Sequence, residues 1–287
     1  MAALRSGEID WWEGPPNDQA KALVRERDIM VISQYATAMG ILRFNHLHPP
    51  FNNAAVRRAL HGAIDQTEAM TAVAGTDRAY WHDGIGLFPA GTPFANDAGI
   101  EIMRRPRDYP AVRQALARAG YNGETIVVLA PTGSGVIGAL SLVGTDQLRR
   151  AGMNVDLQEM EFGTVMRRRL NQAAPDKGGW NVIFTLFDRS NPNTNPYGNY
   201  WIRADGLAAW DGWPTSPRIE ALRAAWLDAR RPRRAAAHLH RAAAAAMAGC
   251  PLHSDGRILA IHRLSERSAR RAARLLRGVL GCSPSLT

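Results

Sequence analysis

Apolar and polar positions along residues 1–229 follow two periods in turn, one typical of strands and one typical of helices. Runs of apolar and β-branched residues occur at "DIMVISQYATAMGILRFN", "ETIVVLAP", "MNVDLQEMEF" and "GWNVIFTLF", and such runs predict strands. The segments between them place apolar residues three and four apart, which predicts helices. Alternation of helices and strands predicts an α/β fold.

Capping residues predict where several helices begin and end. Asn53 precedes apolar residues at helical spacing, and we expect one helix from there to Gly75. Asp108 and Ser216 each precede a further helix, and Glu220 is placed to complete a capping box with Ser216. The same pattern predicts a helix near Asn17 and others over residues 136–152 and 163–174.

The charge is unevenly distributed along the chain. The 287 residues carry 35 basic and 26 acidic side chains, a formal net charge of +9. Twelve Arg and two acids lie in residues 230–287, which leaves 23 basic and 24 acidic residues for residues 1–229. The body is therefore near neutral. Ala and Arg favour helices, but the tail lacks Phe, Trp and Tyr, so we expect it to form helices that pack poorly.

Candidate chemistry is sparse. The stretch "TGSG" (132–135) opens a helix after a strand, where backbone N–H groups can hold an anion. It lacks the full phosphate-binding patterns, so a simple tight turn is favoured. His46, His48, His61 and His82 have no Cys or acid at ligand spacing, and we expect solvated histidines and no metal. No nucleophile motif indicates an enzyme, and no cofactor is implied.

Aromatic residues gather in the last part of the body, among Asn, Asp and Gly. Such side chains on loops either stack on a small ligand in a cleft or pack the core, and the sequence leaves both alternatives open. The residues concerned are Trp180, Tyr197, Tyr200, Trp201, Trp210 and Trp213.

Several stretches resemble one family, in the order in which that family has them. They are "RSGEIDWWEGPP", "LRFNHLHPPFNNAAVRRALHGAID", "LFPAGTPFAND", "DYPAVRQALARAGYNG", "QLRRAGMNVDLQEM", "GGWNVIFTLF" and "GWPTSPRIEALRAAWLDA". Together they resemble the family 5 extracellular solute-binding proteins, the dipeptide- and oligopeptide-binding proteins of ABC transporters. The resemblance implies a two-lobed, type II periplasmic-binding-protein-like α/β fold that closes on a ligand by hinge motion.

The resemblance also implies a division of the chain. Residues 1–45 resemble the end of the first lobe and a hinge crossing, 46–178 the second lobe, and 179–229 the return crossing to the first lobe. The first lobe would then be largely absent, and the chain would be a fragment truncated at its N-terminus. No signal-peptide pattern occurs near Met1, so this chain is expected to stay in the cytoplasm, although the family works in the periplasm.

The implied function is ligand binding without chemistry. The ligand would be a peptide or another small polar solute, and the partners would be the permease and ATPase subunits of an importer, with no nucleic acid and a monomeric chain. Asp188 is the nearest match to an acidic loop that meets a ligand's amino group. Thr185 stands where dipeptide binders have an aromatic residue, which leaves the ligand class open. The other candidate contacts are Phe187, Trp180, Thr132 and Ser134.

Residues 230–287 do not resemble the family's ending. Synonymous codons for residues 249–260, read in a shifted frame, can spell Asp-Val-Pro-Tyr-Ile-Pro-Thr-Gly-Glu-Tyr-Trp, which does resemble it. We therefore interpret the tail as out-of-frame translation that begins near residues 229–234. The alternative is a basic nucleic-acid-binding protein that acts through this Arg-rich tail, although the missing aromatics argue against single-strand stacking.

Overall fold

The chain folds into two compact units. The computed structural model describes residues 1–13, 15, 17–88, 92–101, 103–188, 195–229, 232–249 and 253–263. One unit comprises Met1–Tyr35 and Arg257–Thr287, and the other comprises Ala36–Gly256. The strands β2 and β7 each run from one unit into the other. The division into lobes made from the sequence, with boundaries at residues 45, 178 and 229, stays a prediction.

The smaller unit combines short helices with strand pairing. It contains α1 (Ala2–Ser6), β1 (Trp11–Glu13), α2 (Asn17–Leu23) and the start of β2 (Ile29–Phe44). β1 runs antiparallel to β7 (His253–Arg263), with Trp11 opposite His262. Leu4 and Leu23 are fully buried, and Arg5 of α1 forms an exposed ion pair with Glu26. The helix predicted near Asn17 is confirmed.

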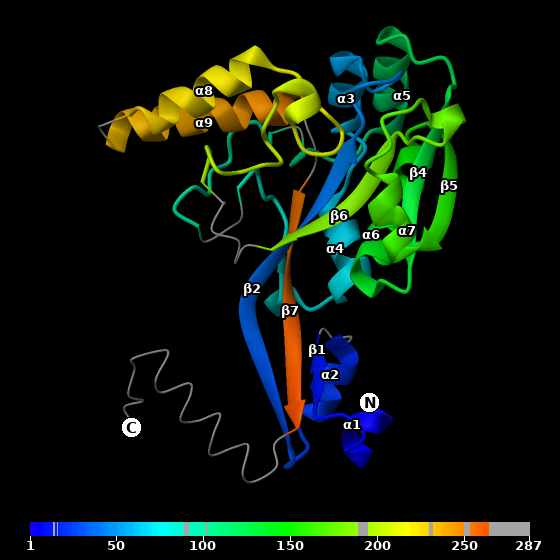
Figure 1. Ribbon diagram of the computed structural model, residues 1–287, viewed down its shortest axis with the longest axis vertical. Helices are drawn as coiled ribbons and strands as arrows, with labels where there is room; N and C mark the ends of the chain where they lie inside the picture. The colour runs from blue at the N-terminus through cyan, green and yellow to red at the C-terminus, as the bar shows by residue number, and fades with distance from the viewer. Residues whose placement is uncertain are drawn as a thin grey trace. The chain divides into compact units, whose positions relative to one another are not determined.

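The larger unit contains the α/β alternation that the sequence predicts (Figure 1). Its helices are α3 (Ala54–Leu60), α4 (Gln66–Ala74), α5 (Tyr109–Arg118), α6 (Gly135–Arg150), α7 (Phe162–Arg168), α8 (Pro217–Leu227) and α9 (Pro232–Gly249). Its strands, besides parts of β2 and β7, are β3 (Trp81–His82), β4 (Thr125–Thr132), β5 (Asn154–Glu161) and β6 (Val182–Asp188). The predicted α/β class is confirmed.

Three parallel strands and the antiparallel strand β2 are neighbours in the sheet of this unit, and β3 pairs with the start of β7. β4 pairs with β5 in parallel along its whole length, from Thr125 opposite Asn154 onward. β6 lies on the other side of β4, also parallel, with Leu129 opposite Ile183. β2 runs antiparallel to β6 beyond it. The continuous apolar run of β6 fits its surroundings, since alternate residues of β6 pack into cores on both faces of the sheet.

Alternating residues of these strands face two separate cores. Ile126 and Val128 of β4 share a core with α3, α5 and α6, whereas Val127 and Leu129 pack with Val165 of α7 and with two tryptophans. The strand period of two places successive side chains on opposite faces. Helices therefore cover both faces of the sheet, as expected for parallel strands joined by helices.

The helix predicted from Asn53 to Gly75 is in fact two helices. Asn53 caps α3 as predicted, but α3 ends at Leu60 and α4 begins at Gln66. Asp65 takes an extended conformation, and its carboxylate accepts a hydrogen bond from the Glu68 N–H. The apolar period continues across the break because Ala63 and Ile64 are also buried, so the pattern alone does not mark it. Gly75 follows α4 as predicted.

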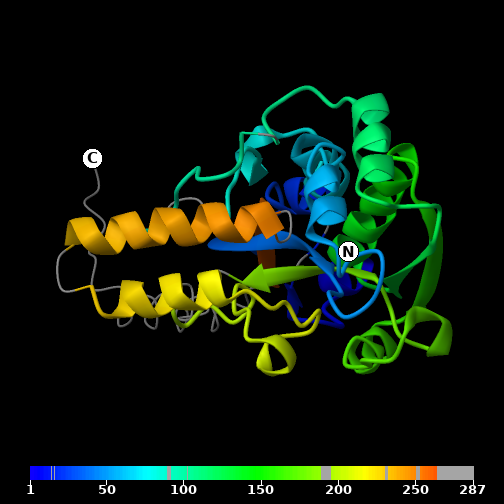
Figure 2. The same ribbon diagram turned by 90° about the horizontal axis from the view of Figure 1, so that it is seen from above.

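For the described residues at the start of the tail, the predicted helix is present, but the predicted poor packing is not observed. Residues 232–249 form the helix α9, which lies side by side with α8 (Figures 1 and 2). The prediction that the tail packs poorly is wrong for this helix, because one of its faces is buried. The alanines on that face allow close approach, and two larger side chains fill the remaining space. The buried residues are Leu239, Ala242, Ala243, Ala246 and Met247. The out-of-frame origin stays a prediction, which sequencing the gene would test.

A buried arginine organises the loop between β6 and α8. The Arg43 side chain of β2 is fully buried, and its guanidinium donates to three backbone oxygens: Trp201 at 2.6 Å, Trp210 at 3.1 Å and Asp211 at 2.6 Å. Asp211 also forms an ion pair with Arg169 of the segment after α7, with a closest N–O distance of 2.8 Å. These contacts hold the loop against the sheet.

Of the two residues predicted to form a capping box at the start of α8, Ser216 caps the helix and Glu220 does not. Ser216 caps the helix by accepting from the Ile219 N–H, as expected. Glu220 instead accepts a hydrogen bond from the Ala204 N–H, and its other oxygen contacts Arg223. The Ser216 N–H is already bonded to the Ala204 carbonyl, so tertiary pairing replaces the local contact.

We expect Gly144→Ala to destabilise the chain although alanine favours helices. A Cβ at Gly144 of α6 would overlap the ring of Phe184 on β6. Overpacking of this kind costs about 1–3 kcal/mol, which urea denaturation would measure. Gly135→Ala in the same helix meets open space and serves as the control. Equal stability of the two variants would contradict this packing.

We expect Arg43→Met to lower the free energy of unfolding by about 3–5 kcal/mol, because three buried carbonyls lose a charged donor. The loss would appear as a lower urea midpoint. Arg118→Met, at an exposed position on α5, should change stability by less than about 0.5 kcal/mol. A similar small change for Arg43→Met would show that the loop does not depend on this side chain.

Candidate functional site

The parallel strands end at one common edge of the sheet. β4 ends at Thr132, β5 at Glu161 and β6 at Asp188, and all three strands run in the same direction. Crevices outside the carboxyl ends of parallel strands are where open α/β sheets bind ligands. We therefore treat this carboxyl edge, defined by these strand ends and the starts of α6 and α7, as the candidate site.

The turn from β4 into α6 presents two hydroxyl groups at the carboxyl edge. Gly133 has a φ of +76°, which other residues rarely adopt, and the chain reverses there. Thr132 is exposed, and Ser134 is half-buried. Ser134 is the N-cap of α6, yet its side chain makes no capping hydrogen bond. The hydroxyl of Ser134 is therefore not used by its own helix. A turn is present at Gly133, as both interpretations of "TGSG" require.

Glu161 is a residue of this edge that the sequence analysis missed. It ends β5, and its carboxylate accepts hydrogen bonds from the N–H groups of Gly163 at 2.8 Å and Thr164 at 3.0 Å. These bonds lower the pKa of Glu161, so it is ionised at neutral pH. The signal was an acid two residues before the predicted helix start at residue 163, close to a helix N-terminus, where carboxylates are favourable.

Two of the predicted contacts on β6 are mostly buried. Thr185 pairs with Ile41 of β2, and Phe187 packs edge-on against Trp201 and Tyr200. The side chain of Asp188 lies outside the described residues, although its backbone pairs with Ala38 at the end of β6. Five of the six predicted residues thus lie on strands or turns that end at the carboxyl edge.

Trp180 is the predicted residue that the fold places elsewhere. It precedes β6, at the opposite end from Asp188, and is fully buried beside Trp213. Its indole N–H donates to the Arg169 carbonyl at 2.9 Å. For Trp180, Trp201 and Trp213, the core alternative left open by the sequence is confirmed. Tyr197 is 49% exposed.

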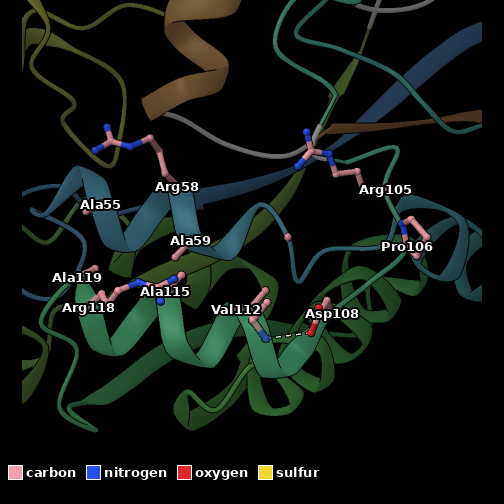
Figure 3. A pocket seen from close by; sticks show the side chains of 12 residues that line it. Ala55, Arg58, Ala59, Arg105, Pro106, Asp108, Val112, Ala115, Arg118 and Ala119 are labelled. Carbon is pink, nitrogen blue, oxygen red and sulfur yellow. Dashed lines mark hydrogen bonds between the residues drawn. The ribbon is translucent and has the colours of Figure 1, made fainter.

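A separate groove of about 700 Å³ lies between α3 and α5 (Figure 3). Alanines from both helices line it, among them Ala59 and Ala115, and its charged lining residues include Arg105 and Arg118. It contains none of the six predicted residues. The groove forms because alanine side chains leave space between two helices that contact each other.

The histidine prediction is wrong at two positions. His61 is buried in the turn after α3, and the Nε2 atom of His46 is buried as well. The larger unit folds over both residues, which a local pattern does not reveal. Among the described residues, no three His, Cys, Asp or Glu side chains form a metal-binding group. Within the same residues, no helix is long and apolar enough to span a membrane.

Comparison with known proteins decides the family. The sequence profile described as bacterial extracellular solute-binding proteins, family 5 Middle, matches residues 1–207. The chain belongs to this family. A probable peptide ABC transporter periplasmic-binding protein, y4tO of Sinorhizobium fredii, is 31% identical over 229 residues, which cover 79% of this chain and 43% of that protein. The glutathione-binding protein GsiB of Pectobacterium atrosepticum is 27% identical over 165 residues, 56% of this chain and 30% of that protein.

Solved structures share the fold. The ABC transporter substrate-binding protein CtaP of Listeria monocytogenes has a TM-score of 0.75 at 14% identity, over 91% of this chain and 52% of that chain. DppA of Helicobacter pylori, solved with the peptide STSA, has a TM-score of 0.73 at 18% identity, over 91% and 50%. The periplasmic-binding-protein-like fold predicted from the sequence is confirmed. The match covers 43% and 30% of the two curated relatives and about half of each solved structure.

We expect the two serine N-caps of the larger unit to respond differently to alanine. Ser216→Ala should lower the free energy of unfolding by about 1 kcal/mol, since it removes the bond to the Ile219 N–H. Ser134→Ala should change it by less than about 0.5 kcal/mol, because that side chain makes no capping bond. Chemical denaturation would measure both. An equal loss at Ser134 would assign its hydroxyl to the helix and not to a ligand.

Proposed function

We propose that this chain is part of the substrate-binding component of an ABC importer that takes up peptides or similar small polar solutes. It would bind its ligand at the carboxyl edge of β4, β5 and β6 and perform no chemistry. Membership of a solute-binding family supports this role. It gives no support to the alternative of a nucleic-acid-binding protein.

The observation that carries the proposal is the set of polar residues gathered at this edge. Thr132 is exposed there, Ser134 makes no capping bond, and Asp188 ends the neighbouring strand in the same direction. Hydroxyls can donate to a ligand's carbonyl or carboxylate oxygens, and a carboxylate can accept from a ligand's ammonium group. A short peptide presents both kinds of group.

Buried residues would support this edge from behind. Phe187 packs against Trp201, Thr185 pairs across to β2, and Trp180 fills the core at the other end of β6. We propose that these three position the strand that carries Asp188. A rigid strand reduces the ordering cost of binding.

The names of the relatives support the ligand class. One relative is described as a probable peptide-binding protein and another as a glutathione-binding protein. A structural neighbour was solved with a peptide. By the same analogy, the working location would be the periplasm, and the partners would be the permease and ATPase of the importer, with the chain acting as a monomer.

We expect the full chain to bind a short peptide such as trialanine. Asp188→Asn should weaken that binding by about tenfold or more, because it removes a charge-assisted contact with the peptide's ammonium group. Isothermal titration calorimetry would measure both affinities. An N-acetylated trialanine lacks the ammonium group, so its affinity should be the same for both proteins.

Asp176→Asn provides the matched control, because Asp176 is an exposed acid in a short turn before β6. It should leave peptide affinity unchanged. Equal weakening for the acetylated peptide would contradict the ammonium contact of Asp188. Absence of binding to a broad set of peptides and small polar solutes would contradict the proposed function itself.

A further inference from the structure

A second cavity lies in the larger unit, away from the carboxyl edge, and is partly open to solvent. It has a volume of about 230 Å³ and is lined by residues of α3, the start of α8 and the end of α9. A cavity needs only about 10–15 Å³ to hold one water molecule, so this one can hold an ion of several heavy atoms. Ala245 and Ala248 of α9 line it, and their small side chains leave the space open.

His46 contributes a polar atom without a partner to this cavity. The backbone N–H of His46 is bonded to the Gly212 carbonyl at 2.8 Å. His46 lines the cavity and is partly buried as a residue, but its Nε2 atom is itself buried and has no hydrogen-bond partner in the described part of the chain. Buried polar atoms are rarely left unpaired, because the lost hydration costs free energy. An occupant that bonds to Nε2 would remove this cost.

The charges around the cavity have one sign. Arg57 and Arg58 of α3 both line it, and none of its described lining residues is acidic. Arg58 is exposed, and Figure 3 shows its side chain extending from α3 away from α5. Burial lowers the pKa of His46, and the positive charges of Arg57 and Arg43 lower it further. The field at this imidazole therefore favours an anion.

The start of α8 adds donors on the opposite side. Thr215 and Ser216 line the cavity, and α8 extends for eleven residues from Ser216. Ser216 accepts from the Ile219 N–H, but its own hydroxyl proton can still be donated. A helix N-terminus carries partial positive charge, which adds to that of the arginines.

We propose that this cavity binds a small oxyanion, for which inorganic phosphate is the probe. The Nε2–H of His46, the guanidinium of Arg58 and the hydroxyls at the start of α8 hold the oxygens. The site is distinct from the carboxyl edge and does not depend on the proposed function. Because α3, α8 and α9 all contribute to it, the bound anion links three segments that are far apart in the sequence.

The first test compares phosphate with sodium chloride at equal ionic strength, using the full chain at pH 7. Phosphate should raise the melting temperature in a saturable way, because a ligand that binds the folded state stabilises it. Arg58→Gln should weaken phosphate binding by roughly ten- to hundredfold, the effect of a lost hydrogen bond to a charged group. Arg118→Gln, at an exposed arginine of α5 outside the cavity, should leave it unchanged.

A second measurement needs no substitution in the buried core. In the wild-type chain, phosphate should shift the ring resonances of His46 in NMR spectra and raise its pKa, since a nearby anion favours the imidazolium. The charged groups that act on this ring are Arg57 of α3 and Arg43 of β2, and Arg58 lines the same cavity. Unchanged ring resonances at saturating phosphate, or equal weakening by Arg58→Gln and Arg118→Gln, would overturn the proposal.

Discussion

The buried guanidinium of Arg43 is the interaction on which the larger unit most depends. It lies on β2, inside the sheet, and donates to backbone oxygens of Trp201, Trp210 and Asp211. A charge in this place is stable only if its donors are satisfied, because desolvation is otherwise too costly. The Arg43 guanidinium therefore holds the loop between β6 and α8 to the sheet, and the carbonyl oxygens of this loop are the acceptors that the buried charge requires. The same loop carries Trp201 and Trp213, which are part of the core.

This constraint explains why the candidate site is built on strands and short turns. β2 and β6 pair over seven residues, from Ala38 opposite Asp188 to Phe44 opposite Val182. Arg43 fixes one end of this pair, and Phe187 packs near the other. The carboxyl edge thus has a rigid base, while Thr132 and Ser134 extend from a turn after a buried strand. Rigid strands that carry a few polar groups are suited to holding a ligand without chemistry.

Local sequence rules predicted most of the elements and their caps, and they failed where a second segment intervened. Asn53, Asp108 and Ser216 cap helices as expected, because capping depends on residues within one turn. Glu220 was expected to cap α8, but its carboxylate instead accepts a hydrogen bond from the Ala204 N–H of a neighbouring loop. The break at Asp65 was missed because burial continues across it. At the site, the turn at Thr132 to Ser134 and the end of β6 were found from the sequence, whereas Glu161 was missed and Trp180 proved to be part of the core.

The sequence by itself determined the α/β class and the order of the strands along the chain, because periodicity and capping are local properties. Its resemblance to known sequences indicated the family. Tertiary structure decided which polar groups are buried. His46 was expected to be solvated, yet its Nε2 atom is buried at a cavity that α8 and α9 help to line. The alanine-rich helix of the tail packs against α8 although its composition suggested otherwise. Burial depends on segments that are distant in the sequence. A pattern read along one segment therefore cannot reveal what another segment will cover.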